Sequence, residues 1–353
     1  MKYSTALALV LTILMATTVS ADVDVENENA DRFTLSAYAR VRYSQFGGAL
    51  TIPDRSFSIE SAGLTADFDI DDNLNGQLQL EIKPDEIFLK DCYILWEPYR
   101  MIELQAGQFK KPFCLNTITS TWNLQAIDHS ITHRELSDLL YSGRDIGVTG
   151  VLNADPVWIP RLSLGVFNGS PDALNQDNEI QYVGRAEFDL PLGIMIGADL
   201  STLRFGKEDP ESVDGYTCSA RQKAMGADLQ LNIEINRDFS FLLRSEYLRG
   251  DNWQMVDVIE GVDPPEFQTW WVTGGITWKT DKPAVDNISA SVSMASWQPD
   301  RSVDSREDEL TLTFDIDTGT PLSIRAAVVN HRPHNIIFEE NHTDYILELA
   351  LDI

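Results

Sequence analysis

Most of the chain alternates apolar and polar residues with a period of two, and this pattern restricts the possible folds more than any other feature of the sequence. Residues 74–83 place Leu or Ile along one face with polar side chains between them, and residues 227–235 and 345–353 follow the same rule. Successive side chains of a β-strand point to opposite faces of the sheet. Each such segment is therefore predicted to be a strand with one apolar and one polar face.

The number and connection of these segments indicate the architecture. Beyond residue 21 there is no run of about 18 apolar residues, so no transmembrane helix is predicted, whereas a membrane-spanning strand needs only about 9–11 residues. Sixteen strands are predicted, near 33–43, 56–70, 74–83, 88–97, 101–110, 145–153, 160–168, 180–190, 193–204, 223–235, 238–249, 267–279, 287–297, 307–317, 321–331 and 343–353. Tight connections at 71–73, 97–100, 191–192, 236–237 and 318–320 alternate with long ones at 111–144, 205–222 and 250–266. Short turns at one rim and long loops at the other are typical of an outer-membrane barrel.

A secreted β-sandwich would also alternate, so this alternative stays open on periodicity alone. Long uniform strands, the absence of a linker and small residues on the apolar faces favour the barrel. Aromatic residues near strand ends agree with interfacial girdles, and they are Tyr43, Phe109, Phe167, Tyr247, Trp278, Trp297 and Tyr345. The sequence thus predicts an all-β fold, a 16-stranded antiparallel transmembrane β-barrel over residues 33–353.

The first residues carry an export signal. Residues 1–21 combine Lys2, a short apolar stretch and small residues that end at Ala21, which predicts a signal peptide cleaved after Ala21. An acidic N-terminal segment over 22–32 follows. We expect the mature protein to contact lipid in the outer membrane of a Gram-negative-type (diderm) cell. With 27 Lys and Arg against 55 Asp and Glu, the net charge of −28 disfavours nucleic acid as a partner.

Few residues are arranged for metal binding or catalysis. Cys92, Cys114 and Cys218 lack the paired spacings of a zinc site, and their spacing does not decide whether two of them pair. His129 and His133 could share a metal on one helical face, but no clear third ligand accompanies them. We therefore expect no metal, no cofactor, no catalytic residues and no enzymatic activity.

Several motifs occur in a fixed order. Residues 104–113 read LQAGQFKKPF, Arg134-Glu135 follows, residues 143–148 read GRDIGV and residues 165–169 read GVFNG. In this order and at this spacing they resemble the phosphate-selective porin O and P family, over roughly residues 57–170. The sequence departs from that family at Ser61, where members tend to carry a basic residue. Its last residue is Ile353, whereas outer-membrane strands most often end in an aromatic residue.

The resemblance implies an outer-membrane channel that assembles as a homotrimer and is narrowed by an inward-folding third external loop. Nine basic residues, on the inward faces of strands or in that loop, are then the candidates for a pore constriction that binds ions. They are Lys110, Lys111, Arg134, Arg144, Arg40, Arg42, Arg185, Arg244 and Arg325. These side chains could form a ladder for anions, because guanidinium groups bind phosphate through two hydrogen bonds. Alternatively, each could pair with a neighbouring acid across the wall.

The predicted function is passive diffusion of small hydrophilic solutes and inorganic ions through a water-filled, weakly selective channel. Fifteen acids and eight bases fall on the polar faces of the strands, which favours cations. Two alternatives remain: an anion-selective or phosphate-selective channel, and a loop-plugged barrel with a structural or surface-interaction role.

Overall fold

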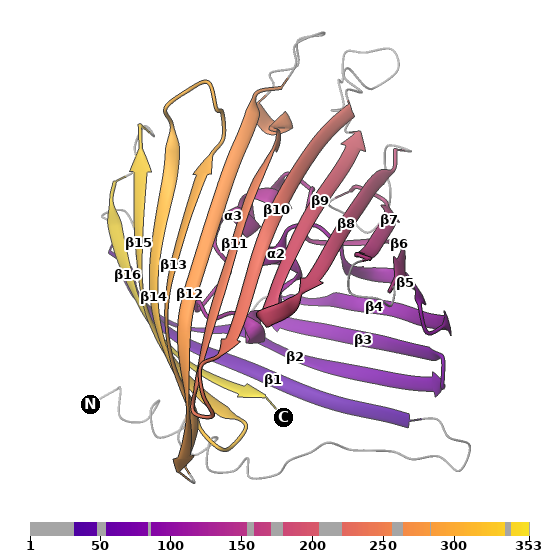
Figure 1. The fold of residues 1–353 in the computed structure, drawn as a ribbon. Coiled ribbons are helices and arrows are strands. Elements are labelled where there is room, and N and C mark those ends of the chain that lie inside the picture. The colour runs from indigo at the N-terminus through magenta and orange to yellow at the C-terminus, as the bar shows by residue number, and fades with distance from the viewer. Residues whose placement is uncertain are drawn as a thin grey trace.

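Sixteen antiparallel strands close into a barrel in which each strand pairs with its neighbours in sequence and β1 pairs with β16 (Figure 1). The computed structural model describes residues 32–47, 54–83, 86–153, 159–170, 179–204, 221–255, 264–282, 284–335 and 340–352. The predicted fold class and strand number are confirmed, and strand ends differ from the expected ones by a few residues. Among the described residues, no helix has the length and apolar character needed to cross a membrane.

The strands are β1 (Arg32–Gln45), β2 (Arg55–Asp71), β3 (Leu74–Lys83), β4 (Glu86–Tyr99), β5 (Ile102–Lys110), β6 (Arg144–Leu152), β7 (Arg161–Phe167), β8 (Gln181–Leu190), β9 (Ile194–Arg204), β10 (Arg221–Glu234), β11 (Phe239–Asp251), β12 (Glu266–Lys282), β13 (Val285–Gln298), β14 (Arg306–Asp317), β15 (Leu322–His334) and β16 (His342–Asp352). The described helices are α2 (Leu115–Ile118) and α3 (Ile131–Asp138), with 3₁₀ turns at η1 (Thr121–Asn123), η2 (Pro191–Gly193) and η3 (Trp253–Met255).

Period-two alternation separates the two faces of the wall. In β14, Leu312 and Phe314 are 47% and 46% exposed, whereas Thr311 and Thr313 are each 5% exposed. The exposed apolar side chains point away from the barrel axis and form a surface suited to hydrocarbon. A Lys or Arg on that surface would cost about 2–4 kcal/mol at the bilayer midplane, which explains why the charged positions lie inside.

One strand breaks the alternation through a bulge. Lys90 and Asp91 are adjacent in β4, and either a bulge or a position near the rim would let both avoid lipid. The register of β3 with β4 shifts here: Gln79 pairs with Asp91 and Leu80 pairs with Leu89, so Lys90 is the extra residue. Of these two possibilities the structure has the bulge, and Lys90 turns toward the lumen.

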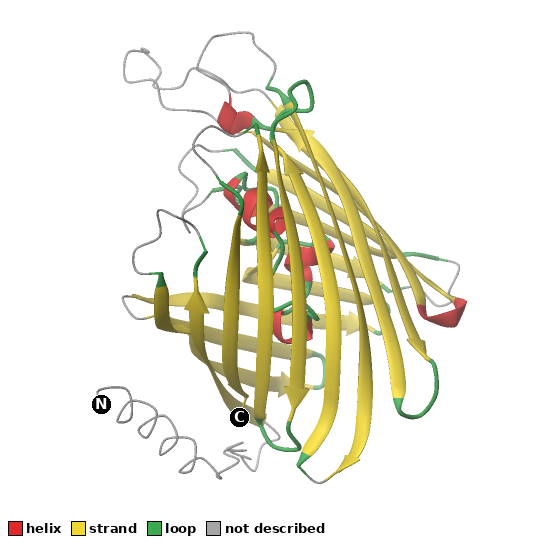
Figure 2. Cartoon of the chain, turned by 90° about the vertical axis from the view of Figure 1, so that its left-hand side faces the viewer, coloured by secondary structure: helices red, strands yellow, loops and turns green. Residues whose placement is uncertain are grey.

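The segment between β5 and β6, residues 111–143, lies within the ring of strands. Figures 1 and 2 show α2 and α3 inside the barrel, and α3 packs against β12 and β13. We call this segment the inner loop. It supplies much of the apolar interior, because Phe113, Leu136 and Tyr141 are completely buried in one hydrophobic cluster.

The cluster corrects one expectation about aromatic residues. Phe109, Phe167 and Trp297 were expected in the interfacial girdles, but they are only 4%, 2% and 6% exposed and belong to the cluster beneath the inner loop. Tyr247, Trp278 and Tyr345 are 45%, 41% and 53% exposed, in agreement with the girdles. The expectation failed where inward positions are apolar, because such positions pack against the loop rather than against water.

Cys92 is exposed and Cys114 is buried, and neither forms a disulfide. Cys218, the signal peptide over 1–21 and nearly all of the acidic segment over 22–32 lie outside the described residues.

The alternation of connections predicts the orientation of the barrel. An epitope tag inserted in 205–220, between β9 and β10, should label on intact cells, because the long connections are expected to face outward. A tag in the tight turn at 318–321, between β14 and β15, should label only after the outer membrane is permeabilised. The reverse pattern in whole-cell immunolabelling would show that the barrel has the opposite orientation.

Candidate functional site

The inner loop is fixed to the wall at its start by one buried carboxylate. Glu246 on β11 is 3% exposed and accepts hydrogen bonds from the backbone N–H of Leu115 at 2.7 Å, the N–H of Asn116 at 3.3 Å and Trp271 Nε1 at 2.7 Å. A buried carboxylate is tolerated only when such donors replace water. These contacts hold the start of α2 against β11 and β12.

Inward arginines hold the middle of the loop by its backbone. Three of them donate to four carbonyls of residues 123–127: Arg244 to Asn123 O at 2.9 Å, Arg325 to Leu124 O at 2.9 Å and to Ala126 O at 3.0 Å, and Arg40 to Ile127 O at 3.1 Å. These side chains on β11, β15 and β1 satisfy backbone carbonyls of the loop where it crosses the lumen without a strand partner.

An ion cluster joins the loop to the seam between β1 and β16. Arg40 and Arg42 contact Glu348 at 2.9 Å and 2.7 Å, and Arg42 contacts Asp128 of the loop at 2.7 Å. Glu348 is fully buried, so both guanidinium groups are needed to compensate it. Glu60 also lies 3.4 Å from Arg42, so three acids face two bases in this cluster.

Two cavities between the inner loop and the described wall differ in size. Against β11–β13 the remaining void is about 10 Å³, whereas a cavity of about 290 Å³ separates the loop from β1–β6. We call this cavity the basic gap. It is lined by Tyr38, Arg40, Ser61, Gln79, Glu81, Phe88, Lys90, Lys110 and Arg144 from the wall and by Ser120, Thr121, Trp122, His129 and His133 from the loop.

The charges around the basic gap are mainly positive. Its lining contains Arg40, Lys90, Lys110 and Arg144 but one carboxylate, Glu81. Lys90 pairs with Glu81, and Arg144 binds Asp91 through two hydrogen bonds of 2.9 Å.

Lys110 is the lining cation whose charge is not compensated by a neighbouring acid. Its ammonium donates to the carbonyls of Thr117 at 2.6 Å and Thr119 at 3.0 Å, and it forms no ion pair with any carboxylate of the described residues. An anion in the gap would therefore meet a net positive charge.

The two loop histidines stack within the gap lining. Their ring centroids are 4.2 Å apart, His133 Nδ1 lies 2.9 Å from Thr117 Oγ1, and His129 Nε2 lies 3.3 Å from Thr121 Oγ1. Burial, and then the neighbouring cations, lower the pKa of His133 to about 4 and the pKa of His129 to about 2. In the described chain no third His, Cys, Asp or Glu completes a metal site with this pair.

Other predicted site residues lie away from the gap. Lys111 is 2% exposed, and its ammonium donates to Leu140 O at 2.6 Å and to Gln181 Oε1 at 2.9 Å, with Asp145 Oδ2 at 3.8 Å. Asp145 also accepts from Gly169 N–H at 2.8 Å, so the three sequence motifs meet at this root of the loop. Lys111 was expected at the constriction; it is instead a buried support, because adjacent residues of an extended chain point apart.

Arg134 and Arg185 are likewise outside the gap lining. Arg134 on α3 is paired with Glu135 at 3.0 Å and with Glu307 at 3.5 Å. Arg185 on β8 is bound by Asp199 at 2.6 Å and Asp228 at 2.8 Å. With Arg42, Arg244 and Arg325 committed to the loop or to acids, the contacts favour the pairing interpretation over a free ladder, and Arg40, Lys110 and Arg144 remain at the gap.

Sequence reasoning missed Lys90, Glu81 and Trp122 as parts of this lining. Alternation allows either Lys90 or Asp91 to face the lumen, and only the bulge shows that both do. Trp122 carries no periodic signal, since its position follows from the fold of the loop.

The comparisons place these features among known proteins. The family described as phosphate-selective porin O and P matches residues 15–241. OprB of Pseudomonas putida, in its high-pH structure, is 12% identical with a TM-score of 0.67, covering 92% of this chain and 94% of that chain. The outer membrane channel DcaP of Acinetobacter baumannii is 10% identical with a TM-score of 0.63, covering 93% and 99%. The anion-selective porin from Comamonas acidovorans is 9% identical with a TM-score of 0.59, covering 92% and 100%. No curated protein sequence matches.

Removal of the inner loop should widen the lumen. Deleting residues 116–140 removes α2, α3 and the loop side of the gap, so conductance should rise by about twofold or more, because the narrowest section limits the current. Single-channel recording in planar bilayers measures this. Unchanged conductance in a correctly folded deletion variant would place the limiting section elsewhere.

Acid should loosen the inner loop. The pKa values of His129 and His133 in the folded loop lie below the ordinary 6.5, so the folded loop favours neutral rings. Above pH 6.5 the loop has its full stability. As the pH falls toward about 4, protonation of the two histidines in the unfolded loop lowers that stability. Current fluctuations should therefore increase between pH 6.5 and 4.

The pH dependence needs a control because carboxylates titrate in part of the same range. The double variant His129→Asn, His133→Asn should lose the pH step above pH 5, whereas His334→Asn, an outlying histidine on β15, should retain it. An identical step in the double variant would assign it to other groups.

Proposed function

The chain belongs to the phosphate-selective porin O and P family, and we propose that solutes cross its barrel through the basic gap, which favours anions. The protein is an outer-membrane porin, a passive channel for small hydrophilic solutes and ions. The observation that carries the proposal is the excess of Arg and Lys around the gap, with Lys110 unpaired by any described carboxylate.

The position of the gap makes these few charges decisive. The cavity between the inner loop and β11–β13 is about 10 Å³, whereas the cavity beside β1–β6 is about 290 Å³. A permeating ion must pass close to the side chains of the narrowest section, where confined charges have their largest effect. Selectivity is thus expected to follow the gap rather than the whole wall.

The wall count, which favoured cations, weighs all inward charges equally. Ion pairs such as Arg185 with Asp199 and Asp228, and Arg40 and Arg42 with Glu348, cancel bases as well as acids, so selectivity depends on where the uncompensated charges lie rather than on the count. Glu246 is enclosed by loop donors. We therefore replace the expected weak cation preference with a preference for anions, phosphate being the candidate that guanidinium and ammonium groups bind well.

The loop-plugged alternative would leave no path beside the inner loop. The gap, lined by charged and hydroxyl-bearing side chains, supports an open channel instead. The anion-selective porin from Comamonas acidovorans has a similar fold, which is compatible with an open channel but is not evidence for one. The proposal requires no catalytic group, so we assign the protein no enzymatic activity.

Three further features of the proposal rest on the sequence and the family. We propose cleavage of the signal peptide after Ala21, a barrel that begins near residue 33 and assembly as a homotrimer. Lipid is expected to contact the exposed apolar side chains of the outer wall, such as Leu164, which is 69% exposed.

Reversal potentials in a KCl gradient test the selectivity. The wild-type channel should prefer chloride, and low phosphate should reduce the chloride current. Lys110→Glu should lower the anion-to-cation permeability ratio several-fold, because one unit charge about 4 Å from an ion in water is worth about 1 kcal/mol.

A matched variant separates the gap from the wall. Lys279→Glu makes the same charge change on β12, outside the gap lining, and should leave the ratio nearly unchanged. Equal effects of the two variants, or a wild-type preference for potassium, would show that the charges of the whole wall, and not those of the gap, determine the selectivity.

A further inference from the structure

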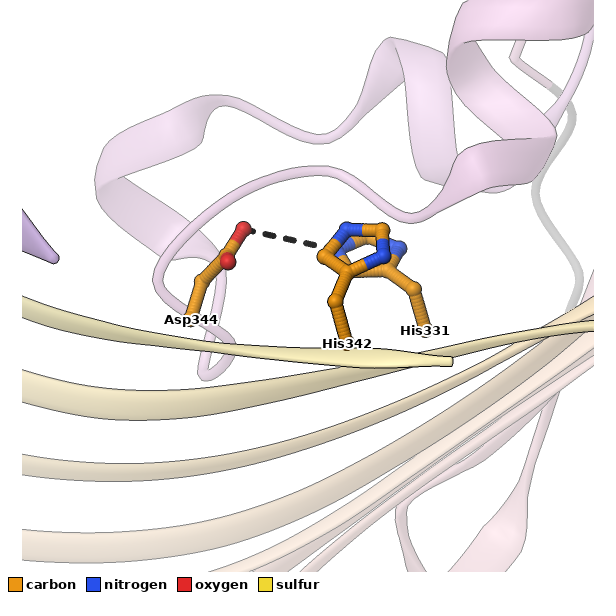
Figure 3. Close-up of side chains that lie close together, drawn as sticks. All are labelled: His331, His342 and Asp344. Carbon is orange, nitrogen blue, oxygen red and sulfur yellow. Dashed lines mark ion pairs between the residues drawn. The ribbon is translucent and has the colours of Figure 1, made fainter. Parts of the chain in front are cut away.

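Two histidines and one aspartate lie together on the lumen side of the last hairpin, outside the basic gap. His331 on β15 pairs directly across the sheet with His342 on β16, and Asp344 follows two residues later on the same face (Figure 3). This is the face that carries Arg325 and Glu348, which point inward. The side chains of His331 and Asp344 are 16% and 14% exposed, so water can reach them.

The distances suit a shared ligand better than direct bonds. One potential donor atom from each residue lies within 4.8 Å of the other two. The imidazole rings of His331 and His342 are nearly parallel, with centroids 4.5 Å apart. His331 Nε2 lies 3.9 Å from Asp344 Oδ2, too far for a hydrogen bond, whereas two ligands of a tetrahedral Zn²⁺ at bond lengths near 2.0–2.1 Å are about 3.4 Å apart.

Each of the three side chains is oriented by an outer contact. Glu307 Oε1 lies 3.4 Å from His331 Nδ1, and His342 Nδ1 donates to the carbonyl of Glu340 at 3.2 Å. These contacts leave Nε2 of each ring as the atom with a free lone pair. Metal-binding histidines are usually held in this way, by a carboxylate or a backbone carbonyl on the second ring nitrogen.

Asp344 is oriented by the connection that follows β1. Its Oδ1 accepts a hydrogen bond of 3.1 Å from the backbone N–H of Gly47, just beyond β1, which leaves Oδ2 facing His331. A side chain at residue 47 would collide with the Thr343 carbonyl, with Cβ at 2.3 Å, so glycine is required for this approach. The contact ties the last hairpin to the first connection.

The surrounding charges favour a cation. Asp344 belongs to the cluster, Glu307 contacts His331, and Glu309 pairs with His331 in the register of β14 and β15. Arg134 is the nearby base, and it is paired with Glu307 at 3.5 Å. Three carboxylates against one guanidinium leave the cluster acidic.

We propose that His331, His342 and Asp344 bind a borderline divalent metal ion, with Zn²⁺ as the representative. Two imidazole nitrogens and one carboxylate oxygen form a donor set that such ions accept, with a fourth position open to water from the lumen. Mg²⁺ and Ca²⁺ prefer sets made of oxygen alone and should bind poorly. The site is independent of the route and charge preference proposed for the channel.

Isothermal titration of the purified, detergent-solubilised full-length barrel, freed of any histidine tag, with ZnCl₂ tests the site. The wild type should bind one Zn²⁺ per chain, and excess Mg²⁺ should not compete. His331→Asn and His342→Asn should each weaken binding by more than tenfold. Glu307→Gln leaves all three ligands in place but removes an outer carboxylate, and should weaken binding by about 10–100-fold.

His334→Asn is the matched control. His334 lies on the same strand, is 43% exposed and pairs with Asp308 rather than with the cluster, so its loss should leave Zn²⁺ binding unchanged. Heat-modifiable gel migration verifies that each variant is folded. Absence of Zn²⁺ binding to the wild type overturns the proposal, as does binding that survives in the folded His331→Asn, His342→Asn double variant or falls equally in His334→Asn.

Discussion

Closure of the sheet between β1 and β16 is the constraint on which the rest of the structure depends. In hydrocarbon no water can satisfy an unpaired backbone N–H or C=O group, so a wall of strands is stable only when its last strand pairs with its first. Here the seam runs from Tyr38 paired with Asp352 to Gln45 paired with Tyr345. Arg40, Arg42 and Glu348 lie at this seam, and the same arginines hold Asp128 of the inner loop. The closing pair of strands and the position of the loop are thus coupled.

The inward arginines show how a charged residue in a barrel can have a mechanical role. A loop that crosses a lumen has carbonyl groups without strand partners, and guanidinium groups can satisfy several of them from one side chain. Arg325 donates to two loop carbonyls, and Arg244 donates to a third. A high count of inward Arg therefore does not by itself indicate an anion path. The chemistry of the path depends on the few bases that no acid compensates.

The sequence was sufficient for the wall because alternation is a local property. Sixteen segments and their turns could be predicted from neighbours in the chain, whereas at Lys90 the sequence left a bulge and a position near the rim both open. Alternation could not reveal that Phe109, Phe167 and Trp297 point inward onto an apolar loop, because an apolar side chain gives the same signal whether it meets lipid or a packed loop. Lys110 and Lys111 were equivalent in sequence, and only the fold of residues 111–143 separates a gap lysine from a buried one. His331 and His342 meet through the register of a hairpin whose connection length alternation does not define.

The inner loop divides the barrel into two arcs with different tolerance to sequence change. Several of its anchors, including Glu246, Arg244 and Arg325, come from the second half of the chain, whereas the wall of the basic gap comes from β1–β6. Arg40 and Arg42 of the first arc also hold the loop, so the positions of this arc that can vary in charge are those that do not contact the loop. Lineages of such a barrel could thus acquire new solute preferences through substitutions confined to its first 150 residues, without redesigning the scaffold that defines the width of the passage.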